Sequence, residues 1–290
     1  SKSDAQMAEV IIKDYLEQHG VTVGKRQTSV KPFKYRVPSW VKFKTDTFNA
    51  VLETVKGVTF VAGDSGQVKL PKELGKAIDF YGAKYQIGIG GIHTQEKRQV
   101  IKPESDDFFS EYDLTSMYPT IIIEQNLYPE HLTSKFLDVY TSIKNDRVRA
   151  KREGDKVMDA VYKIALNGSY GKFGSKYSYL YSPELLIQTT ITGQLSLLMM
   201  IERLELADVK VVSANTDGIN VLFKKDRFTE VETIIYGWEL ETGYNFECTE
   251  YKATYSRDVN NYIAVKTDGS IKGKGAFAEP NLMKNPTNEI

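Results

Sequence analysis

Two aspartates, Asp113 and Asp217, lie in segments whose residue types and spacing suit the binding of divalent cations. Asp113 belongs to EYDLTSMYPT (111–120) at the expected end of a strand, and Asp217 belongs to VVSANTDGINV (211–221) at the expected tip of a β-hairpin. Mg²⁺ prefers oxygen ligands and is often held by one or two carboxylates together with phosphates and water. A pair of ions held in this way can activate a hydroxyl group and bind a triphosphate, which is the chemistry of nucleotidyl transfer.

A third segment, KIALNGSYGKFG (163–174), lies between the two aspartates. Lys163, Asn167 and Tyr170 recur at positions i, i+4 and i+7 of an expected helix, so their side chains share one face. Taken singly, the aspartates are better explained as a capping residue and an ordinary Asp-Gly turn. Three such segments in one order, each on a suitable element, are hard to obtain by chance.

The elements around these segments predict an α+β fold. The strand FFSEYDL (108–114) leads into a helix with Pro119 in its first turn. Helices at 133–152 and 156–173, joined by three residues, form an antiparallel hairpin. The other expected elements are helices at 4–19 and 184–206, short β-rich runs in 48–101, a hairpin around Asp217 and two or three strands in 246–275. The expected buried face of the second hairpin helix carries Val157, Val161, Ile164 and Ala165.

Charge is balanced over the whole chain but unevenly placed along it. With 38 Lys and Arg against 38 Asp and Glu, the chain is no polycation made for nucleic acid. Residues 135–176 nevertheless hold ten basic and five acidic side chains, whereas residues 230–250 hold six Glu and no Lys or Arg. The basic stretch suits a groove that faces phosphates, and it equally suits the solvated surface of a helical hairpin.

Other features of the sequence bear on its class and location. The single Cys248 excludes an internal disulfide and suits a reducing compartment. No apolar run approaches membrane-spanning length, and no secretory signal opens the chain. We therefore expect an intracellular protein without a membrane partner.

The three segments resemble motifs A, B and C of the family B DNA polymerases, particularly those of phages and plasmids. The resemblance covers about residues 20–285. It implies a polymerase palm, whose antiparallel sheet carries both aspartates, and a two-helix fingers hairpin. The implied activity is template-directed DNA polymerisation, with primer–template DNA and dNTPs as substrates and two Mg²⁺ ions, replaceable by Mn²⁺, as cofactors.

Motif A has the pattern DxxSxYP, which is matched at Asp113, Ser116, Tyr118 and Pro119. The resemblance makes Asp113 a metal ligand and a catalytic residue, and the Leu114 carbonyl a further metal ligand. Ser116 and Tyr118 would bind the nucleotide. The Tyr118 ring would act as a steric gate, lying where a ribose 2′-hydroxyl would go.

Motif B has the pattern KxxxNxxYG, which is matched at Lys163, Asn167, Tyr170 and Gly171. By the resemblance, Lys163 would hold the triphosphate and protonate the leaving group, which makes it a catalytic residue. Asn167 and Tyr170 would lie near the nascent base pair. Arg147, in the segment RVRAK, would be the second cation that binds the triphosphate.

Motif C departs from its usual spelling, YxDTDS. Ser213 replaces the Tyr, Asn215 the first Asp and Gly218 the final Ser, so that only Thr216 and Asp217 remain. Asn215 supplies no charge, which leaves its role in ion binding open. Asp217 occupies the position of the metal ligand that we expect to be indispensable.

Two other segments resemble parts of the family that contact DNA. GIGGIHT (88–94) resembles a Gly-rich loop near the template strand, and a β-bulge explains its glycines nearly as well. VNNYIAV (259–265) and the KGKG that follows resemble a segment that contacts the primer duplex. The residues assigned to DNA binding are Gly90, Gly91, Gly171, Asn261, Tyr262, Lys272 and Lys274.

The resemblance also predicts an organisation of the chain. No DxE-type exonuclease motif precedes motif A, a complete thumb is not expected, and the spacing leaves no room for the insertions of protein-primed relatives. The chain would act in the cytoplasm of a bacterial host, with phage or host replication proteins as partners. The predicted divisions are an N-terminal region leading into the palm (1–107), palm with motif A (108–132), fingers with motif B (133–175), palm with motif C (176–280) and the start of a thumb or tail (281–290).

Three other interpretations fit parts of the sequence. A reverse transcriptase or primase would use similar chemistry, but the absent YxDD and the motif B helix argue against it. A catalytically silent palm that binds DNA or serves in assembly would be consistent with Asn215. In an α+β protein with coincidental motifs, metal binding would depend on neither aspartate.

Overall fold

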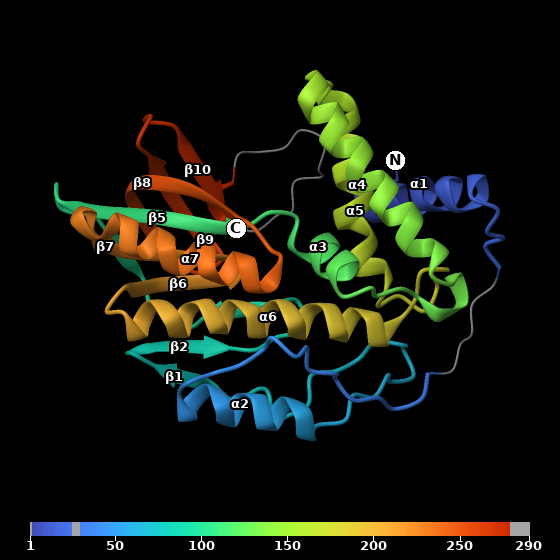
Figure 1. The fold of residues 1–290 in the computed structure, drawn as a ribbon, viewed down its shortest axis with the longest axis horizontal. Helices are drawn as coiled ribbons and strands as arrows, with labels where there is room; N and C mark the ends of the chain where they lie inside the picture. Colours follow the sequence, from blue (N-terminus) through green and yellow to red (C-terminus); the bar gives the residue numbers. More distant parts are fainter. Residues whose placement is uncertain (1, 25–29, 279–290) are drawn as a thin grey trace. The chain divides into compact units, whose positions relative to one another are not determined.

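The computed structural model describes residues 2–24 and 30–278, and the chain divides into two compact units (Figure 1). The helical unit contains residues 1–38, 52–74 and 116–193. The sheet unit contains residues 39–51, 75–115 and 194–290. The predicted start of a thumb or tail at 281–290 lies outside the described residues.

The sheet unit is built on an antiparallel sheet that contains all ten strands of the described chain. The strand order is β1-β2-β3-β6-β7-β5-β8-β9-β10, and β4 pairs with β8. The strands are β1 (Ile78–Phe80), β2 (Ala83–Gln86), β3 (Ile92–Thr94), β4 (Gln99–Ile101), β5 (Asp107–Leu114), β6 (Lys210–Thr216), β7 (Gly218–Lys224), β8 (Phe246–Asp258), β9 (Asn261–Lys266) and β10 (Ile271–Lys274). Two short 3₁₀ turns, η2 (Lys225–Arg227) and η3 (Gly275–Phe277), complete the connections.

β5 lies between β7 and β8, and its alternating side chains separate two faces of the sheet. Tyr112 points to the face covered by α7 (Phe228–Thr242), where its hydroxyl donates to the Glu232 carboxylate at 2.7 Å. Phe109, Glu111 and Asp113 alternate with Tyr112 and therefore lie on the opposite face. Phe109 packs there in an apolar cluster with Tyr251, Tyr262 and Ala264. The sheet face without α7 thus carries the first predicted catalytic residue.

α7 occupies the acidic segment, for which the sequence analysis predicted no helix. Its stripe of Val231, Ile235 and Trp238 is buried, and Trp238 stacks on Phe246 with the ring centroids 4.8 Å apart. The Trp238 indole N–H donates to the Ser196 carbonyl at 2.9 Å. The apolar residues of this segment do recur with the period of a helix, but the glutamates between them made that period hard to recognise in the sequence.

α6 (Pro183–Leu206) is long and apolar enough to cross a membrane by length and composition, contrary to the expectation that no run approaches such a length. However, 94% of its most apolar 18-residue window is buried inside the protein. The Thr189 and Thr192 hydroxyls donate to carbonyls one turn earlier, so these buried polar groups are satisfied within the helix. The burial identifies α6 as a core helix.

The helical unit contains the predicted two-helix hairpin. Gly154, at φ 75°, ends α4, and the Asp155 carboxylate accepts from the Met158 amide at the start of α5. A capping box of Ser3 and Gln6 begins the first helix. The helices are α1 (Asp4–Gln18), α3 (Met117–Glu124), η1 (Glu130–Leu132), α4 (Lys135–Glu153) and α5 (Lys156–Lys172), while α2 (Asp46–Gly57) and α6 each contain a boundary between the units.

The buried face of α5 differs from the prediction. Val157, predicted to be buried, is 72% exposed, and the buried residues are Ala165, Leu166 and Ser169. A Cβ added at Gly168 would lie 3.0 Å from the Asp4 carbonyl, which shows how closely α1 approaches. Because α5 packs against both α1 and α4, its buried face is rotated about the helix axis from the face that was predicted.

The mixture of helices and one antiparallel sheet confirms the predicted α+β class. The predicted palm and fingers boundaries remain predictions.

We predict that Glu202→Ala lowers the free energy of unfolding by about 3 kcal/mol, measured by chemical denaturation. Glu202 is 3% exposed, and its carboxylate accepts from the backbone amides of Lys44 and Thr45 at 2.8 and 3.0 Å. Its removal leaves these partly buried donors without their acceptor. As a control, Glu241→Ala removes an exposed ion pair with Arg203 and should change the value by less than about 0.5 kcal/mol. Equal, small effects of both substitutions would contradict this account.

Candidate metal and nucleotide site

Asp217 lies in the tight turn between β6 and β7. Asn215 pairs with Gly218 across the hairpin, so Thr216 and Asp217 form its two-residue loop. Thr216 has φ 58°, which is uncommon for a β-branched residue, and the Asp217 amide donates to the Asn215 carbonyl at 2.7 Å. Strained residues of this kind persist only where the surrounding structure holds them in place, and they are concentrated at functional sites.

β5 brings Asp113 next to this turn. Asp113 pairs in register with Gly218, and the Leu114 amide donates to the Asp217 carbonyl at 2.7 Å. A side chain at Gly218 would collide with the Asp113 carboxylate, since an added Cβ overlaps its Oδ1. The replacement of the usual motif C serine by glycine therefore has a local reason. The structure places the two aspartates together, as the sequence predicted.

Both carboxyl groups are held in an environment that disfavours a lone negative charge. Burial, and after it the Glu111 carboxylate, raises the pKa of Asp113 to about 7, although 38% of its side chain is exposed. Burial also raises the pKa of Asp217, and Lys274 opposes this shift. A divalent cation would relieve the desolvation cost that these shifts express.

Glu111 and Lys272 form part of this site, and the sequence analysis did not identify Glu111. The Glu111 carboxylate is 8% exposed and accepts from the Lys272 ammonium at 2.6 Å and from the Tyr251 hydroxyl. Lys272 also lies 3.8 Å from Asp113. Burial disfavours the charge of Lys272, but the Glu111 carboxylate outweighs this effect and raises the pKa of Lys272. The available signal was the position of Glu111 two residues before Asp113 on one strand, which puts both on one face.

Several residues assigned to DNA binding contribute to local structure. The Asn261 amide group donates to Asp258 and accepts from the Ala276 amide, which fixes the β8–β9 turn. Tyr262 is 8% exposed, and the Lys274 ammonium lies 5.9 Å from its ring centroid. The Asn215 side chain donates to the Val259 carbonyl at 2.8 Å.

The glycines assigned to DNA binding differ in their surroundings. Gly91 is buried, and a Cβ there would lie 2.9 Å from the Thr216 Cα, so this glycine packs against the motif C turn. Gly90 and Gly171 are exposed, and a Cβ at either would meet open space. Close packing against Thr216 is by itself a reason for a glycine at position 91, so DNA binding is not needed to explain it. The surroundings of Gly90 and Gly171 do not require a glycine.

The residues assigned to the nucleotide lie in the helical unit. The Arg147 guanidinium donates to the Asp159 carboxylate at 2.9 Å and to the Ser116 hydroxyl at 2.8 Å. The rings of Tyr118 and Tyr170 stack with their centroids 3.9 Å apart. Lys163 and Asn167 are exposed on α5. Ser116 thus joins Arg147, and Tyr118 joins Tyr170, through contacts between motif A and the hairpin helices.

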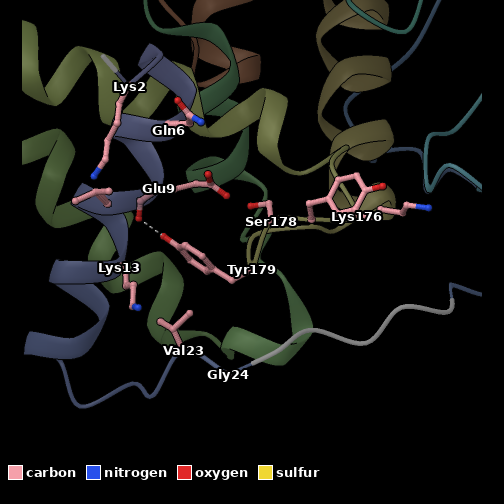
Figure 2. A pocket seen from close by; sticks show the side chains of 11 residues that line it. Lys2, Gln6, Glu9, Lys13, Val23, Gly24, Lys176, Ser178 and Tyr179 are labelled. Atoms are coloured by element: carbon pink, nitrogen blue, oxygen red, sulfur yellow. Dashed lines mark hydrogen bonds between the residues drawn. The ribbon is translucent and has the colours of Figure 1, made fainter.

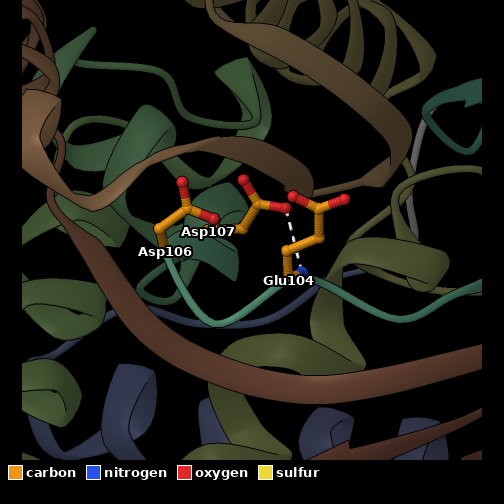
Figure 3. A group of neighbouring side chains, drawn as sticks. All are labelled: Glu104, Asp106 and Asp107. Carbon is orange, nitrogen blue, oxygen red and sulfur yellow. Dashed lines mark hydrogen bonds between the residues drawn. The ribbon is translucent and has the colours of Figure 1, made fainter.

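A second acidic group lies at the other end of β5. The carboxylates of Glu104, Asp106 and Asp107 come within 4.8 Å of one another (Figure 3). The Lys224 ammonium lies 3.5, 3.1 and 2.8 Å from them and lowers the pKa of Asp107 through its hydrogen bond. Asp107 is six residues before Asp113, about 20 Å along the strand. These carboxylates therefore have a protein cation of their own and are distinct from the predicted pair.

The helical unit also contains a cavity of about 640 Å³ between α1 and residues 176–179 (Figure 2). Lys13 and Lys176 are among its lining residues, and the Tyr179 hydroxyl donates to the Glu9 carbonyl at 2.5 Å. The predicted catalytic and nucleotide-binding residues are not among the described residues that line it. Its size alone therefore assigns it no role in the predicted chemistry.

Comparison with known proteins gives the following similarities. The family described as DNA polymerase type B, organellar and viral, matches residues 107–184. DNA polymerase II of Escherichia coli K12 is 28% identical over an alignment that covers 39% of this chain and 17% of the relative. DNA polymerase 1 of Sulfolobus acidocaldarius is 24% identical over an alignment that covers 46% of this chain and 16% of the relative. The family B DNA polymerase structure from Pyrobaculum calidifontis aligns with a TM-score of 0.48 and 18% identity, over 62% of this chain and 28% of that one. The matched region is thus less than a fifth of the two curated relatives.

We predict that Mn²⁺ binding to the isolated protein weakens about tenfold between pH 8 and pH 6. Protons compete with the cation for Asp113, whose pKa is raised to about 7, so the carboxyl group is ionised above this pH and protonated below it. Electron paramagnetic resonance of free Mn²⁺ measures the affinity. Asp113→Asn should weaken binding and remove most of the pH dependence. Equal affinity of the parent protein at both pH values would contradict the assignment.

Proposed function

We propose that the chain carries the nucleotidyl-transfer site of a template-directed DNA polymerase, because residues 107–184 match the family of type B DNA polymerases and two DNA polymerases are similar to the chain. The observation that carries the proposal is the register of β5 against β7, which sets Asp113 beside Asp217 at one edge of the site. Primer–template DNA and dNTPs are the substrates in this proposal.

Asp113 and Asp217, with the Leu114 carbonyl beside them, would hold the divalent cations. This donor set fits Mg²⁺ and Mn²⁺, because it consists of oxygen atoms and contains two carboxylates whose charge is poorly solvated. When bound, such ions activate the primer hydroxyl and neutralise the triphosphate and the leaving pyrophosphate. The aspartates themselves would orient these ions.

Arg147 and Lys163 would bind the triphosphate. Arg147 has five N–H donors in a planar group, and its contacts with Asp159 and Ser116 hold that group in place. Only 12% of the Arg147 side chain is exposed, so a phosphate would meet a cation that is already ordered. Lys163 is exposed and suited to protonating the leaving group as well as binding it.

Tyr118 would select the sugar. A ring stacked on Tyr170 at 3.9 Å cannot easily turn aside, and a steric gate needs such rigidity to reject a ribose 2′-hydroxyl. Tyr170 would then act through Tyr118 and through the nascent base pair.

We predict that Asp113→Asn and Asp217→Asn each lower the rate of primer extension about a thousandfold, a loss of about 4 kcal/mol of transition-state stabilisation. Asn215→Ala should cost much less, because its side chain carries no charge. Single-nucleotide extension of a labelled hairpin template measures the rates, and circular dichroism establishes that each variant is folded. Asp106→Asn, in the second acidic group, is the matched control and should retain activity. A folded Asp217→Asn with near-normal activity would remove that residue from the site.

We predict that Tyr118→Ala raises the use of ribonucleotides relative to deoxyribonucleotides by at least about tenfold. Truncation removes the ring that blocks the 2′-hydroxyl. Tyr118→Phe keeps the ring and its stacking and should keep the discrimination. The ratio of kcat/KM for paired ribo- and deoxyribonucleoside triphosphates is the measurement. Equal ratios in the parent and Tyr118→Ala would place the gate elsewhere.

A further inference from the structure

We propose that Glu111 is a positioning residue that holds the Lys272 ammonium away from Asp113 and thereby keeps the Asp113 carboxylate available to a divalent cation. The inference rests on the proposed function only for the identity of the cation site. Its basis is the arrangement of one buried carboxylate, one lysine and one aspartate on a single sheet face.

The first observation is the way in which Glu111 is held. Its carboxylate is 8% exposed and accepts from the Tyr251 hydroxyl and, at 3.4 Å, from the Tyr262 hydroxyl. β5 fixes its backbone through pairing with Asn220 on one side and Thr249 on the other. A buried carboxylate with several donors is costly to move, because each donor would lose its partner. Glu111 is therefore a fixed hydrogen-bond acceptor for the Lys272 ammonium.

The second observation is the unequal sharing of Lys272. Its Nζ lies 2.6 Å from the Glu111 Oε2, which is a hydrogen bond, and 3.8 Å from the Asp113 Oδ2, which is too long for one. The Lys272 side chain is 36% exposed and has the flexible stem of every lysine. Without Glu111, the ammonium would be drawn to Asp113, its other close carboxylate, and would compete with a metal ion there.

The third observation concerns Asn215, which provides no charge where motif C usually has its first aspartate. The Asn215 amide is used in a bond to the Val259 carbonyl. Asn215 and Glu111 nevertheless line one polar cavity of about 20 Å³, together with Tyr262 and Asn220. Glu111 thus brings a carboxylate from β5 to the cavity that Asn215 lines from β6, and Glu96 brings a second one.

The balance of charges supports this assignment. When a cation holds Asp113 and Asp217 in their ionised form, these two residues and Glu111 contribute three negative charges, while Lys272 and Lys274 contribute two positive charges. The five groups together carry a net charge of −1, which favours a cation. Without Glu111 the net charge would be zero, and Lys272 would lose its strongest partner.

The test is Mn²⁺ binding by electron paramagnetic resonance in the parent protein, Glu111→Gln, Lys272→Met and the double variant. Glu111→Gln should weaken Mn²⁺ binding by at least about tenfold, because a charge is lost and Lys272 is released toward Asp113. In the Lys272→Met background, the same change should weaken binding by only about twofold to threefold, since charge alone then acts. Glu250→Gln, which removes a carboxylate of β8 outside the network, should leave binding unchanged.

An equal effect of Glu111→Gln in both backgrounds would show that Glu111 acts by charge alone and would overturn the proposal. No effect in either background would overturn it as well, as would a parent protein whose Mn²⁺ binding is unchanged by Asp113→Asn. If Glu111→Gln fails to fold, Tyr251→Phe is the second variant. It removes one donor to Glu111 without a change of charge, and it should weaken Mn²⁺ binding about twofold when Lys272 is present and not in Lys272→Met.

This readout separates the inference from the proposed function. Mn²⁺ binding that follows the pattern above in a protein without primer extension would contradict the polymerase proposal and support the role of Glu111. Primer extension that depends on both aspartates, together with additive Mn²⁺ affinities, would support the polymerase and overturn the role of Glu111.

Discussion

The pairing of Asp113 with Gly218 across β5 and β7 is the contact on which the rest of the carboxylate site depends. Seven residue pairs, from Asp107 with Lys224 to Asp113 with Gly218, fix this register. A slip of one residue would turn Asp113 to the face that α7 covers, because side chains alternate along a strand. The missing side chain at Gly218 then lets the carboxylate lie over the neighbouring strand, close to the Asp217 turn. Sheet register and one glycine together set the geometry of the candidate metal site.

This geometry places carboxylates of like charge close together in a partly buried site. Burial and neighbouring carboxylates raise the pKa of Asp113, and Thr216 adopts a backbone conformation that threonine seldom uses. Both features cost stability, and proteins tolerate such costs where function requires them. The sheet supplies the compensation through the apolar cluster around Phe109 and through α7, whose Trp238 is fully buried. The site is thus a locally unfavourable arrangement held by a favourable core.

The sequence predicted the elements that have local signals. α4 ends at a glycine, α5 begins after a capping aspartate, and the β6–β7 turn contains the Asp of an Asp-Gly step, so the hairpin and the turn were both found. α7 was missed because its glutamates are as numerous as its buried residues, and the buried face of α5 was wrong because contacts with α1 are not encoded within α5. Glu111 was missed for a similar reason. Its partners Tyr251 and Lys272 are 140 and 161 residues away, and only the fold brings them to it.

Motif A is shared between the two compact units, since Asp113 and Leu114 belong to the sheet unit and the chain enters the helical unit at Ser116. Ser116 has φ 47°, a left-handed conformation at the junction. Asp113, which would bind a cation, and Tyr118, which would select the sugar, are therefore five residues apart in sequence but belong to different compact units. In the proposed function, substitutions that loosen the packing around Tyr118 and Tyr170 would change substrate choice while the carboxylates keep their support. Such a division would let selectivity diverge in evolution while the chemistry stays constant.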